Sequence, residues 1–410
     1  MRSKRTARRR FLKEGAALAG LAVGVPSASG QTLGSVRAER PTDLTVARSL
    51  MAYGERARFV KTSRFVYEDA WDLHTDPNGK DAHTVLDQQL GIITPAPLHY
   101  IQSHGNPPPD IDPSQHRLMI HGMVDRPLVF TMDELMRFPA VSRIHYIECI
   151  GNAPNPRAKT LEAMHGMISC SEWNGVLLSV LLKEAGVKSG ASWIIGEGAD
   201  ATKHGKSVPL GKAMQDVLVA YGQNGEPVRP HQGYPLRLVV PGFEGKYHVK
   251  WLRGIKVVDQ PYMTYWEQSS YIKGENHQGA YSPAQGPKSV ITFPSAGQRL
   301  PSRGFYTIKG FAWSGGGAVR RVEVSTDGGR TWNDAHLPEQ PLRIALTRFE
   351  VPWTWNGGEA VLQSRCTDDV GRVQPSAADH ARFWGSHKAP HGNPIQPWRV
   401  TNEGHVLNAL

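Results

Sequence analysis

The chain has 410 residues, of which 40% are hydrophobic and 20% are charged, with 42 glycines and 30 prolines. These proportions exclude a coiled coil and a disordered chain, and the length fits two domains better than one. The formal net charge is +10, which on its own would suggest a nucleic-acid-binding protein. The position of the basic residues decides whether that suggestion holds.

The first 29 residues have the features of an export signal. They contain seven Lys and Arg but one acidic residue, and the apolar run Gly15–Val25 follows, then a stretch of small residues. This order is typical of a secretory signal peptide, and the apolar run is shorter than the roughly 20 residues that span a bilayer. Because Arg8–Lys13 is also a twin-arginine pattern, we expect residues 1–29 to export the chain, already folded, to the periplasm.

The rest of the chain is far less basic than the total charge suggests. Beyond residue 29 there are 40 Lys and Arg against 36 Asp and Glu, a net charge near +4. We therefore expect no nucleic-acid partner, and, since no second long apolar run occurs, no membrane span in the mature chain. Three cysteines, Cys149, Cys170 and Cys366, leave at least one thiol unpaired.

The predicted elements begin after an irregular stretch. Residues 30–90 are polar and predict an arm that wraps the surface or a partner. Apolar periodicity, turns and capping residues then predict an α+β domain over residues 91–284. Its predicted elements are, in chain order, a strand at 117–124, a helix capped by Thr131, a strand at 142–149, a helix at 175–185 that ends at Gly186, and strands at 237–241 and 249–258.

The pattern changes near residue 285. Short alternating segments at 306–313, 319–325 and 358–368 are separated by glycine-rich turns. Strands at this spacing predict an antiparallel β-sandwich over residues 285–410. The run Gly315–Gly317 lies between two of these strands and predicts a hairpin loop.

The common catalytic and nucleotide-binding motifs do not occur, and without a Cys-x-x-Cys-His segment we expect no haem on this chain. Cys149 follows a predicted strand directly. A thiolate there would suit a soft metal, although position alone favours the alternative of a small buried hydrophobe. Tyr271 is either a proton donor near a substrate or a partly buried aromatic residue. The polar clusters 231–237 and 245–251 are either donors to an anionic ligand such as phosphate or solvated loops.

A series of segments, in the same order along the chain, resembles the sulfite oxidase family of molybdopterin enzymes. In the first domain they are Ile147–Asn152, Trp173–Leu182, Ala220–Glu226, Gly233–Arg237, Val240–Gly242 and His248–Trp251. In the second, Lys309–Gly317, Val324–Trp332 and Thr367–Pro375 resemble that family's dimerisation domain. The resemblance implies an α+β fold in which a molybdopterin-binding domain precedes an immunoglobulin-like β-sandwich dimerisation domain. It also implies a molybdenum-molybdopterin cofactor and a homodimer.

The resemblance assigns roles to individual residues. It makes Cys149 the thiolate ligand of molybdenum, beside two dithiolene sulfurs and oxo groups, and so reverses the preference for a buried hydrophobe. Tyr271 matches the family's active-site tyrosine, and Gln102 stands at a substrate-binding position. The residues that match cofactor contacts are His104, Asp200, Gln232, Arg237, His248, Val249 and Lys250.

Departures from the family concern the substrate pocket. Sulfite oxidases place arginines around the substrate anion, and the first two of these positions hold Gln102 and Pro154, although Arg157 is near the second. The third falls around residues 387–388. Because a charge-assisted hydrogen bond contributes about 1.5–3 kcal/mol, such a pocket should bind free sulfite weakly.

One branch of the family matches better, that of the molybdenum subunits of sulfane dehydrogenases. Pro109–Arg117, Ser169–Trp173 and Ile395–Val400 carry this resemblance. It implies a substrate sulfane sulfur held on a carrier protein, oxidised to the sulfonate level during periplasmic thiosulfate oxidation. It also implies a c-type cytochrome subunit as electron acceptor within a heterotetramer. The alternatives are a dehydrogenase that oxidises free sulfite to sulfate, and an exported protein that binds partners without a cofactor.

Overall fold

The computed structural model describes residues 56–57, 59–66, 81–103, 107–264, 267, 283–384 and 391–410. The chain divides into two units, residues 1–60 and 61–410, and the fold below is that of the second unit. The predicted signal peptide and most of the predicted arm lie outside the described residues. So do His104, Tyr271 and residues 387–388.

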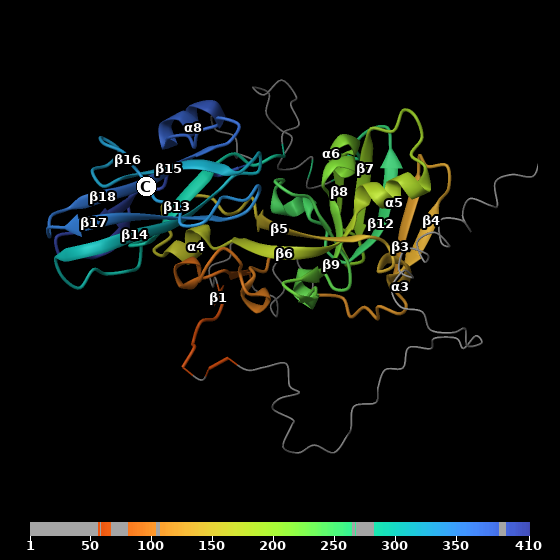
Figure 1. Ribbon diagram of the computed structural model, residues 1–410, viewed down its shortest axis with the longest axis horizontal. Helices are drawn as coiled ribbons and strands as arrows, with labels where there is room; N and C mark the ends of the chain where they lie inside the picture. Colours follow the sequence, from red (N-terminus) through yellow and green to blue (C-terminus); the bar gives the residue numbers. More distant parts are fainter. Residues whose placement is uncertain are drawn as a thin grey trace, which may run out of the picture. The chain divides into compact units, whose positions relative to one another are not determined.

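Two sheets form the N-terminal α+β domain (Figure 1). One has the strand order β4-β3-β12-β7-β8, in which β12 runs parallel to β3 and the other pairs are antiparallel. Its strands are β3 (Arg117–Gly122), β4 (Leu128–Thr131), β7 (Trp193–Gly198), β8 (Gly205–Pro209) and β12 (Leu252–Val258). The other has the order β10-β9-β6-β5, with β11 also paired to β9, and is built from β5 (Ala140–Glu148), β6 (Ile168–Leu177), β9 (Leu218–Gln223), β10 (Glu226–Pro227) and β11 (Arg237–Val239).

Short helices connect these strands. They are α3 (Met132–Leu135), α4 (Leu161–His165), α5 (Leu178–Ala185) and α6 (Leu210–Gln215), with single 3₁₀ turns η1 (Leu86–Gln88), η2 (Ala96–Leu98), η3 (Pro230–Gln232) and η4 (Gly245–Tyr247). A small pair, β1 (Phe65–Val66) and β2 (Ala82–His83), precedes them. The predicted cap is confirmed, because Thr131 Oγ1 accepts a hydrogen bond from the Glu134 N–H while the Glu134 side chain accepts one from the Thr131 N–H.

The predicted helix at 175–185 is wrong in its first three residues. Strand β6 continues to Leu177, because Gly175 to Leu177 pair with β9. A Cβ on Gly175 would lie 2.2 Å from the carbonyl oxygen of Val219, so only glycine allows this close pairing. The helical end is confirmed, since Gly186 adopts a left-handed conformation with φ of 74°. The predicted strand at 249–258 begins at Leu252, after Trp251 with its positive φ.

The C-terminal domain is an antiparallel β-sandwich, as predicted. The first sheet has the order β13-β14-β17 and the second β16-β15-β18-β19-β20. The strands are β13 (Lys288–Phe293), β14 (Gly304–Trp313), β15 (Val319–Ser325), β16 (Asn333–Asp334), β17 (Thr347–Trp355), β18 (Ala360–Asp368), β19 (Trp398–Val400) and β20 (Val406–Asn408), and helix α8 spans Ala377–Trp384. Figure 1 shows these strands grouped on one side of the 61–410 unit, with β5 and β6 extending toward them.

The hairpin predicted at Gly315–Gly317 is wrong. Strands β14 and β15 belong to different sheets, so this run crosses from one sheet of the sandwich to the other. Gly315 instead packs against the N-terminal α+β domain, where a Cβ on this residue would lie 2.2 Å from the Gly242 carbonyl oxygen. The glycine run therefore lets two backbones approach closely rather than turning a hairpin.

One apolar core joins the two domains. It contains Tyr146 and Cys170 from β5 and β6, together with Trp313 and Cys366 from the sandwich. Leu86, near the end of the predicted arm, is buried in the same core. A second core, between the sheets of the N-terminal α+β domain and α5, includes Leu118, Leu181, Val219, Leu238 and Ile255.

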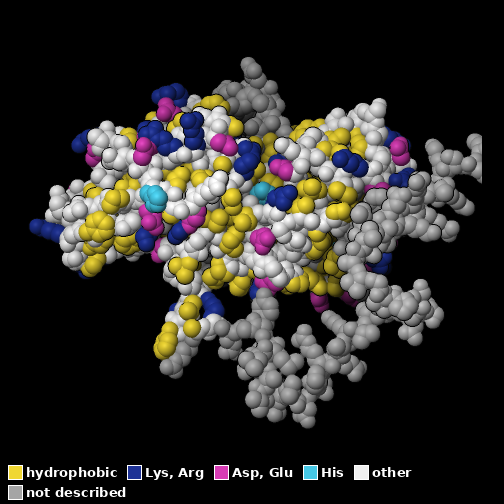
Figure 2. All heavy atoms as spheres, in the orientation of Figure 1, with side chains coloured by type: hydrophobic (Ala, Val, Ile, Leu, Met, Phe, Trp, Pro, Cys, Tyr) yellow, Lys and Arg dark blue, Asp and Glu magenta, His cyan; other side chains and the backbone are white. Residues whose placement is uncertain are grey.

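The charged side chains on one face of the described chain are mixed in sign (Figure 2). On the described part of the face in Figure 2, basic and acidic side chains are interspersed, which is unlike the continuous basic surface of nucleic-acid-binding proteins. Of the helices that the structure describes, none is both long and apolar enough to cross a membrane.

Candidate functional site

A pocket opens where the end of β5 meets four loops from distant parts of the chain. Its walls come from the segment after η2, the turn after β5, the loop after β7, and the segments around η3 and η4. The lining residues are His99, Tyr100, Gln102, Ser103, Cys149, Ile150, Asp200, Thr202, His204, Gln232, Arg237, Gly245, Lys246, His248, Lys250 and Trp251.

The pocket brings together most of the residues that the sequence singles out. Cys149, Gln102, Asp200, Gln232, Arg237, His248 and Lys250 all line it. Val249 does not: its side chain is buried in the second core, its carbonyl accepts from the Leu238 N–H, and its own N–H donates to the Tyr247 carbonyl. A cofactor contact at Val249, like those at His104 and Tyr271 outside the described residues, stays a prediction.

Cys149 is the first residue of a tight turn. Its N–H donates to the Met167 carbonyl at 3.0 Å, and its own carbonyl accepts from the Asn152 N–H at 3.0 Å. The thiol Sγ accepts from the Gly151 N–H at 3.4 Å. Burial raises the pKa of this thiol to about 11, with nearby carboxylates including Asp81 adding to the shift, so the protonated thiol is favoured near neutral pH in the cofactor-free chain.

The donor set at Cys149 fits a metal that arrives with a cofactor. Within the described ranges, no group of three or more His, Cys, Asp or Glu side chains lies close enough to hold a metal ion. The Cys149 thiolate could bind a metal whose other ligands belong to a cofactor. A soft thiolate donor at the edge of a pocket suits that arrangement.

Arg237 gives the pocket a buried positive charge. Its side chain is 3% exposed, Nη1 donates to the Gln232 carbonyl at 2.9 Å, and the guanidinium lies 4.8 Å above the Trp173 ring. Burial lowers the pKa of Arg237 to about 10. The Nε–H has no hydrogen-bond partner among the described residues, an arrangement that fits an anion held in the pocket.

Lys250 adds a second buried cation. Its ammonium donates to the Gln102 carbonyl at 3.0 Å, to Ser103 Oγ at 2.8 Å and to the His231 carbonyl at 3.1 Å. Burial, with a contribution from Arg237, lowers the pKa of Lys250 to about 7. Neither Lys250 nor Arg237 forms an ion pair with a carboxylate of the described residues, so this part of the pocket fits a phosphate group.

His248 and Asp200 shape the pocket through the backbone. The His248 ring accepts from the Val240 N–H at Nδ1 and donates to the Phe243 carbonyl from Nε2, both at 3.2 Å. Burial holds the pKa of His248 well below its usual range, so the ring is neutral. Asp200 accepts from the His204 N–H at 3.2 Å and from the Thr202 hydroxyl, which fixes the loop after β7.

Several lining residues could not be found from the sequence. His99 is buried, its Nε2 has no hydrogen-bond partner in the part of the chain that the structure describes, and burial lowers its pKa to about 3. Its ring stacks on Tyr100 and meets Trp173 edge-on. Lys246 lies within the polar cluster 245–251 and forms a buried ion pair with Glu244 at 2.8 Å. The polar cluster indicates Lys246 as a candidate from the sequence. His99 and Tyr100 lie in an apolar stretch that gives no sign of a binding site.

Comparisons with known proteins match both domains. Residues 104–266 match the model of the oxidoreductase molybdopterin binding domain, and residues 286–385 match that of the Mo-co oxidoreductase dimerisation domain. Mitochondrial sulfite oxidase of Mus musculus is 37% identical over 328 residues, 72% of this chain. An NADH nitrate reductase of Solanum lycopersicum is 36% identical over 305 residues, 65% of this chain. The chain spans only 59% and 33% of these two relatives.

A solved structure covers nearly all of the chain. The sulfane dehydrogenase SoxCD from Paracoccus pantotrophus superposes with a TM-score of 0.83 and 36% sequence identity, over 94% of this chain and 100% of the matched chain. On the two domain matches, the identity and this superposition, the chain belongs to the sulfite oxidase family of molybdopterin oxidoreductases.

Proposed function

We propose that this protein is the molybdenum subunit of a sulfane dehydrogenase, which oxidises sulfane sulfur carried on a cysteine of a carrier protein to the sulfonate level. The reaction would be a step of thiosulfate oxidation. Cys149 would bind the molybdenum of the cofactor, which supplies two-electron oxidation and oxygen transfer when bound. Arg237 and Lys250 would hold the cofactor's phosphate, and the neutral His248 and Asp200 would keep the surrounding loops in place.

The observation that carries the proposal is that, among the described residues, no arginine stands at the first two of the family's substrate-binding positions. Gln102 lines the pocket, and Lys250 fixes its carbonyl oxygen. Pro154 packs against the C-terminal segment, where a Cβ on Gly392 would lie 3.4 Å from Pro154 Cδ. Arg157 is exposed and is not among the described lining residues, so it does not replace the missing arginines. A small dianion such as sulfite therefore lacks the arginines that bind it in sulfite oxidases. A sulfane sulfur carried on a protein depends less on them, because contacts between the carrier protein and this protein contribute to binding.

The remaining parts of the proposal concern partners and location. The dimerisation domain supports a homodimer, and the likeness to SoxCD supports a separate c-type cytochrome subunit that receives the electrons, within a heterotetramer. We also propose that residues 1–29 direct export of the loaded protein to the periplasm through the twin-arginine route. The main alternative is a dehydrogenase for free sulfite, which the identity to sulfite oxidase supports.

The test compares kcat/KM for a sulfur-loaded carrier protein and for free sulfite, with a c-type cytochrome as acceptor. We expect the carrier to be preferred at least 100-fold. Gln102→Arg should raise kcat/KM for sulfite by about tenfold, because one charge-assisted hydrogen bond contributes about 1.5–3 kcal/mol. Efficient turnover of free sulfite by the native protein, with none of the carrier, would establish the alternative.

Cys149→Ser is the control for the cofactor. It should reduce the molybdenum content from about one atom per chain to a small fraction and remove both activities, because a hydroxyl is a poor soft-metal ligand. A native protein that contains no molybdenum when produced with the cofactor available would instead support a cofactor-free binding protein.

A further inference from the structure

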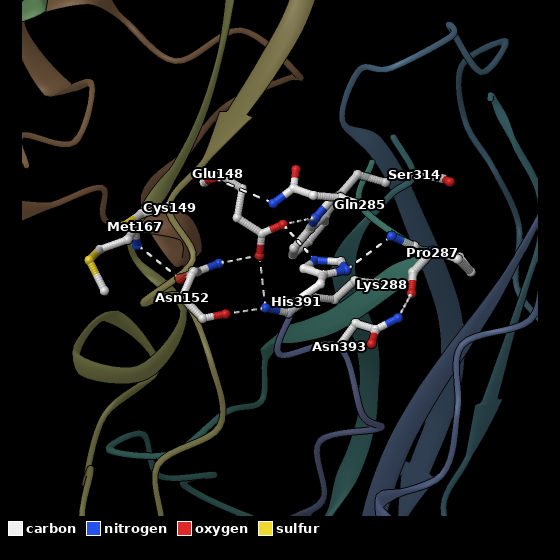
Figure 3. A network of polar contacts seen from close by, with 12 residues as sticks. Glu148, Cys149, Asn152, Met167, Gln285, Pro287, Lys288, Ser314, His391 and Asn393 are labelled. Atoms are coloured by element: carbon white, nitrogen blue, oxygen red, sulfur yellow. Dashed lines mark hydrogen bonds and ion pairs between the residues drawn. The ribbon is translucent and has the colours of Figure 1, made fainter. Parts of the chain in front are cut away.

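A buried carboxylate immediately before Cys149 is held by the β-sandwich domain (Figure 3). Glu148 Oε1 accepts from the Lys288 ammonium and from Asn152 Nδ2, each at 2.8 Å. Oε2 accepts from Trp313 Nε1 at 2.8 Å and from His391 Nε2 at 3.0 Å. Three of these four donors come from the sandwich strands and the C-terminal segment, far from Glu148 in sequence.

The Lys288 ammonium contacts both ends of the turn that contains Cys149, residues 148–152. Besides its ion pair with Glu148, it donates to the carbonyl of Asn152. The side-chain oxygen of Asn152 accepts a hydrogen bond from the Met167 N–H at 3.0 Å. The backbone N–H of Asn152 donates to the Cys149 carbonyl and so completes the turn. Residues 148–152 are thus tied to a single cation that the opposite domain supplies.

The C-terminal segment closes the same network from another side. The Gly286 N–H donates to His391 Nδ1 at 3.0 Å, so the proton of the neutral ring is on Nε2 and points to Glu148. Gly392 follows, and a Cβ there would lie 2.4 Å from the Cβ of Ala153. The turn therefore has little room to shift toward the sandwich.

Stability alone is a poor explanation for this arrangement. Glu148 and Lys288 both have fully buried side chains, and the cost of removing two charges from water usually offsets their attraction, so apolar residues would stabilise the junction as well. What four directional hydrogen bonds provide, and apolar packing does not, is a single fixed position for the carboxylate and for the backbone beside it.

We propose that the Lys288–Glu148 pair positions the Cys149 thiol, so that the sandwich domain sets the geometry of the proposed metal ligand in addition to its part in dimerisation. Lys288 is a positioning residue, since it acts on Cys149 through Glu148 and Asn152 and does not line the pocket. The inference rests on the proposed function only where it takes Cys149 as the metal ligand. The constraint on the thiol itself is a property of the cofactor-free chain.

The test measures the alkylation rate of Cys149 by iodoacetamide in the full-length protein, produced without cofactor, by mass spectrometry of its peptides. Cys170 and Cys366 are fully buried and serve as internal references for global opening. Lys288→Met should raise the rate at Cys149 at least tenfold relative to these two. His391→Ala, which removes one of the four donors and carries less risk of misfolding, should raise it about threefold, and Lys288→Arg should restore a rate close to the native one.

Arg372→Met is the matched control. It removes a cation from Asp368, another carboxylate with a fully buried side chain, in an ion pair whose two partners both belong to the sandwich domain. It should lower the melting temperature without changing the relative rate at Cys149. If Lys288→Met and His391→Ala also leave that relative rate unchanged, the positioning role is wrong.

A second readout uses the cofactor-loaded protein. In His391→Ala with native molybdenum content, the sulfur-to-metal charge-transfer absorption should shift in wavelength, while in Arg372→Met it should not. An unchanged band in His391→Ala would count against the proposal. If Cys149→Ser retains molybdenum, the proposed metal ligand is wrong, but the alkylation rates still decide whether Lys288 positions the thiol.

Discussion

At the scale of single residues, buried charges occur here in two different settings. Glu148 is surrounded by donors: burial alone would raise its pKa, but Lys288 and His391 hold it well below the usual value. Arg237 and Lys250 lie in the pocket with backbone, hydroxyl and amide oxygens as their described partners. The first setting is complete within the protein, whereas the second leaves positive charge for a ligand.

Glu162, in the first turn of α4, makes the free energy of unfolding depend on pH, with a sign that can be predicted. Burial, together with the neighbouring carboxylate of Asp87, raises the pKa of Glu162 to about 7. The unfolded chain ionises at about pH 4.3, so the native state loses stability as the pH rises from there to about 7. Glu162→Gln removes this loss, and at pH 8 the variant should be more stable by about 1–2 kcal/mol, with a smaller difference at pH 5.

Melting curves of the variant and the native protein at the two pH values measure this effect. Glu134→Gln is the matched control of opposite sign, because hydrogen bonds from Thr131 lower the pKa of Glu134. The loss of that carboxylate should lower the melting temperature at pH 8. A Glu162→Gln variant that is less stable than the native protein at pH 8 would contradict the prediction.

At the scale of elements, the segment after β11 and the glycine run after β14 form a close backbone contact between the domains. Gly242 has a φ of 78°, and a Cβ there would lie 2.2 Å from the Gly315 carbonyl oxygen. Gly242→Ala should reduce the free energy of unfolding by at least about 2 kcal/mol. The left-handed conformation alone costs a residue with a Cβ about 1–2 kcal/mol, and the steric overlap adds to it.

Denaturant unfolding measures that loss, and Gly211→Ala is its control. Gly211 lies in α6, where a Cβ would have no atom within 4 Å. This substitution should stabilise the protein by up to about 1 kcal/mol through helix propensity. If the two alanine variants unfold at the same denaturant concentration, the contact between Gly242 and Gly315 does not constrain the junction.

Elements defined by local pattern could be predicted from the sequence. The capping residues Thr131 and Glu134, the helix end at Gly186 and the strand that leads to Cys149 each depend on neighbouring residues. The end of β6 could not, because Gly175 owes its extended conformation to pairing with β9. The link from Lys288 to Glu148 could not either, because an isolated lysine gives no sign of which carboxylate it will meet. The pocket was predictable where the family resemblance supplied the residues.

At the scale of the whole molecule, the two domains share structure that neither completes alone. The core around Tyr146 and Trp313 contains residues from both, and the Tyr146 N–H donates to the Ile344 carbonyl of the sandwich at 3.1 Å. The buried pair of Glu148 and Lys288 crosses the same junction. Separating the domains would expose apolar surface and two charges together, so we expect residues 61–410 to unfold as one cooperative unit.

Hydrogen exchange in increasing denaturant, read by mass spectrometry, tests this cooperativity. Leu362, in β18, is fully buried in the shared core, and Leu362→Ala should destabilise the protein by about 2–5 kcal/mol. We expect exchange midpoints to fall equally for peptides from β18 and from β12, although β12 lies in the second core. The reciprocal variant, Leu181→Ala in α5, should lower the midpoints of the sandwich to the same extent as those of the catalytic domain. Unequal shifts in both variants would mean that the sandwich folds independently and that the ionic pair at Lys288 joins two separately stable domains.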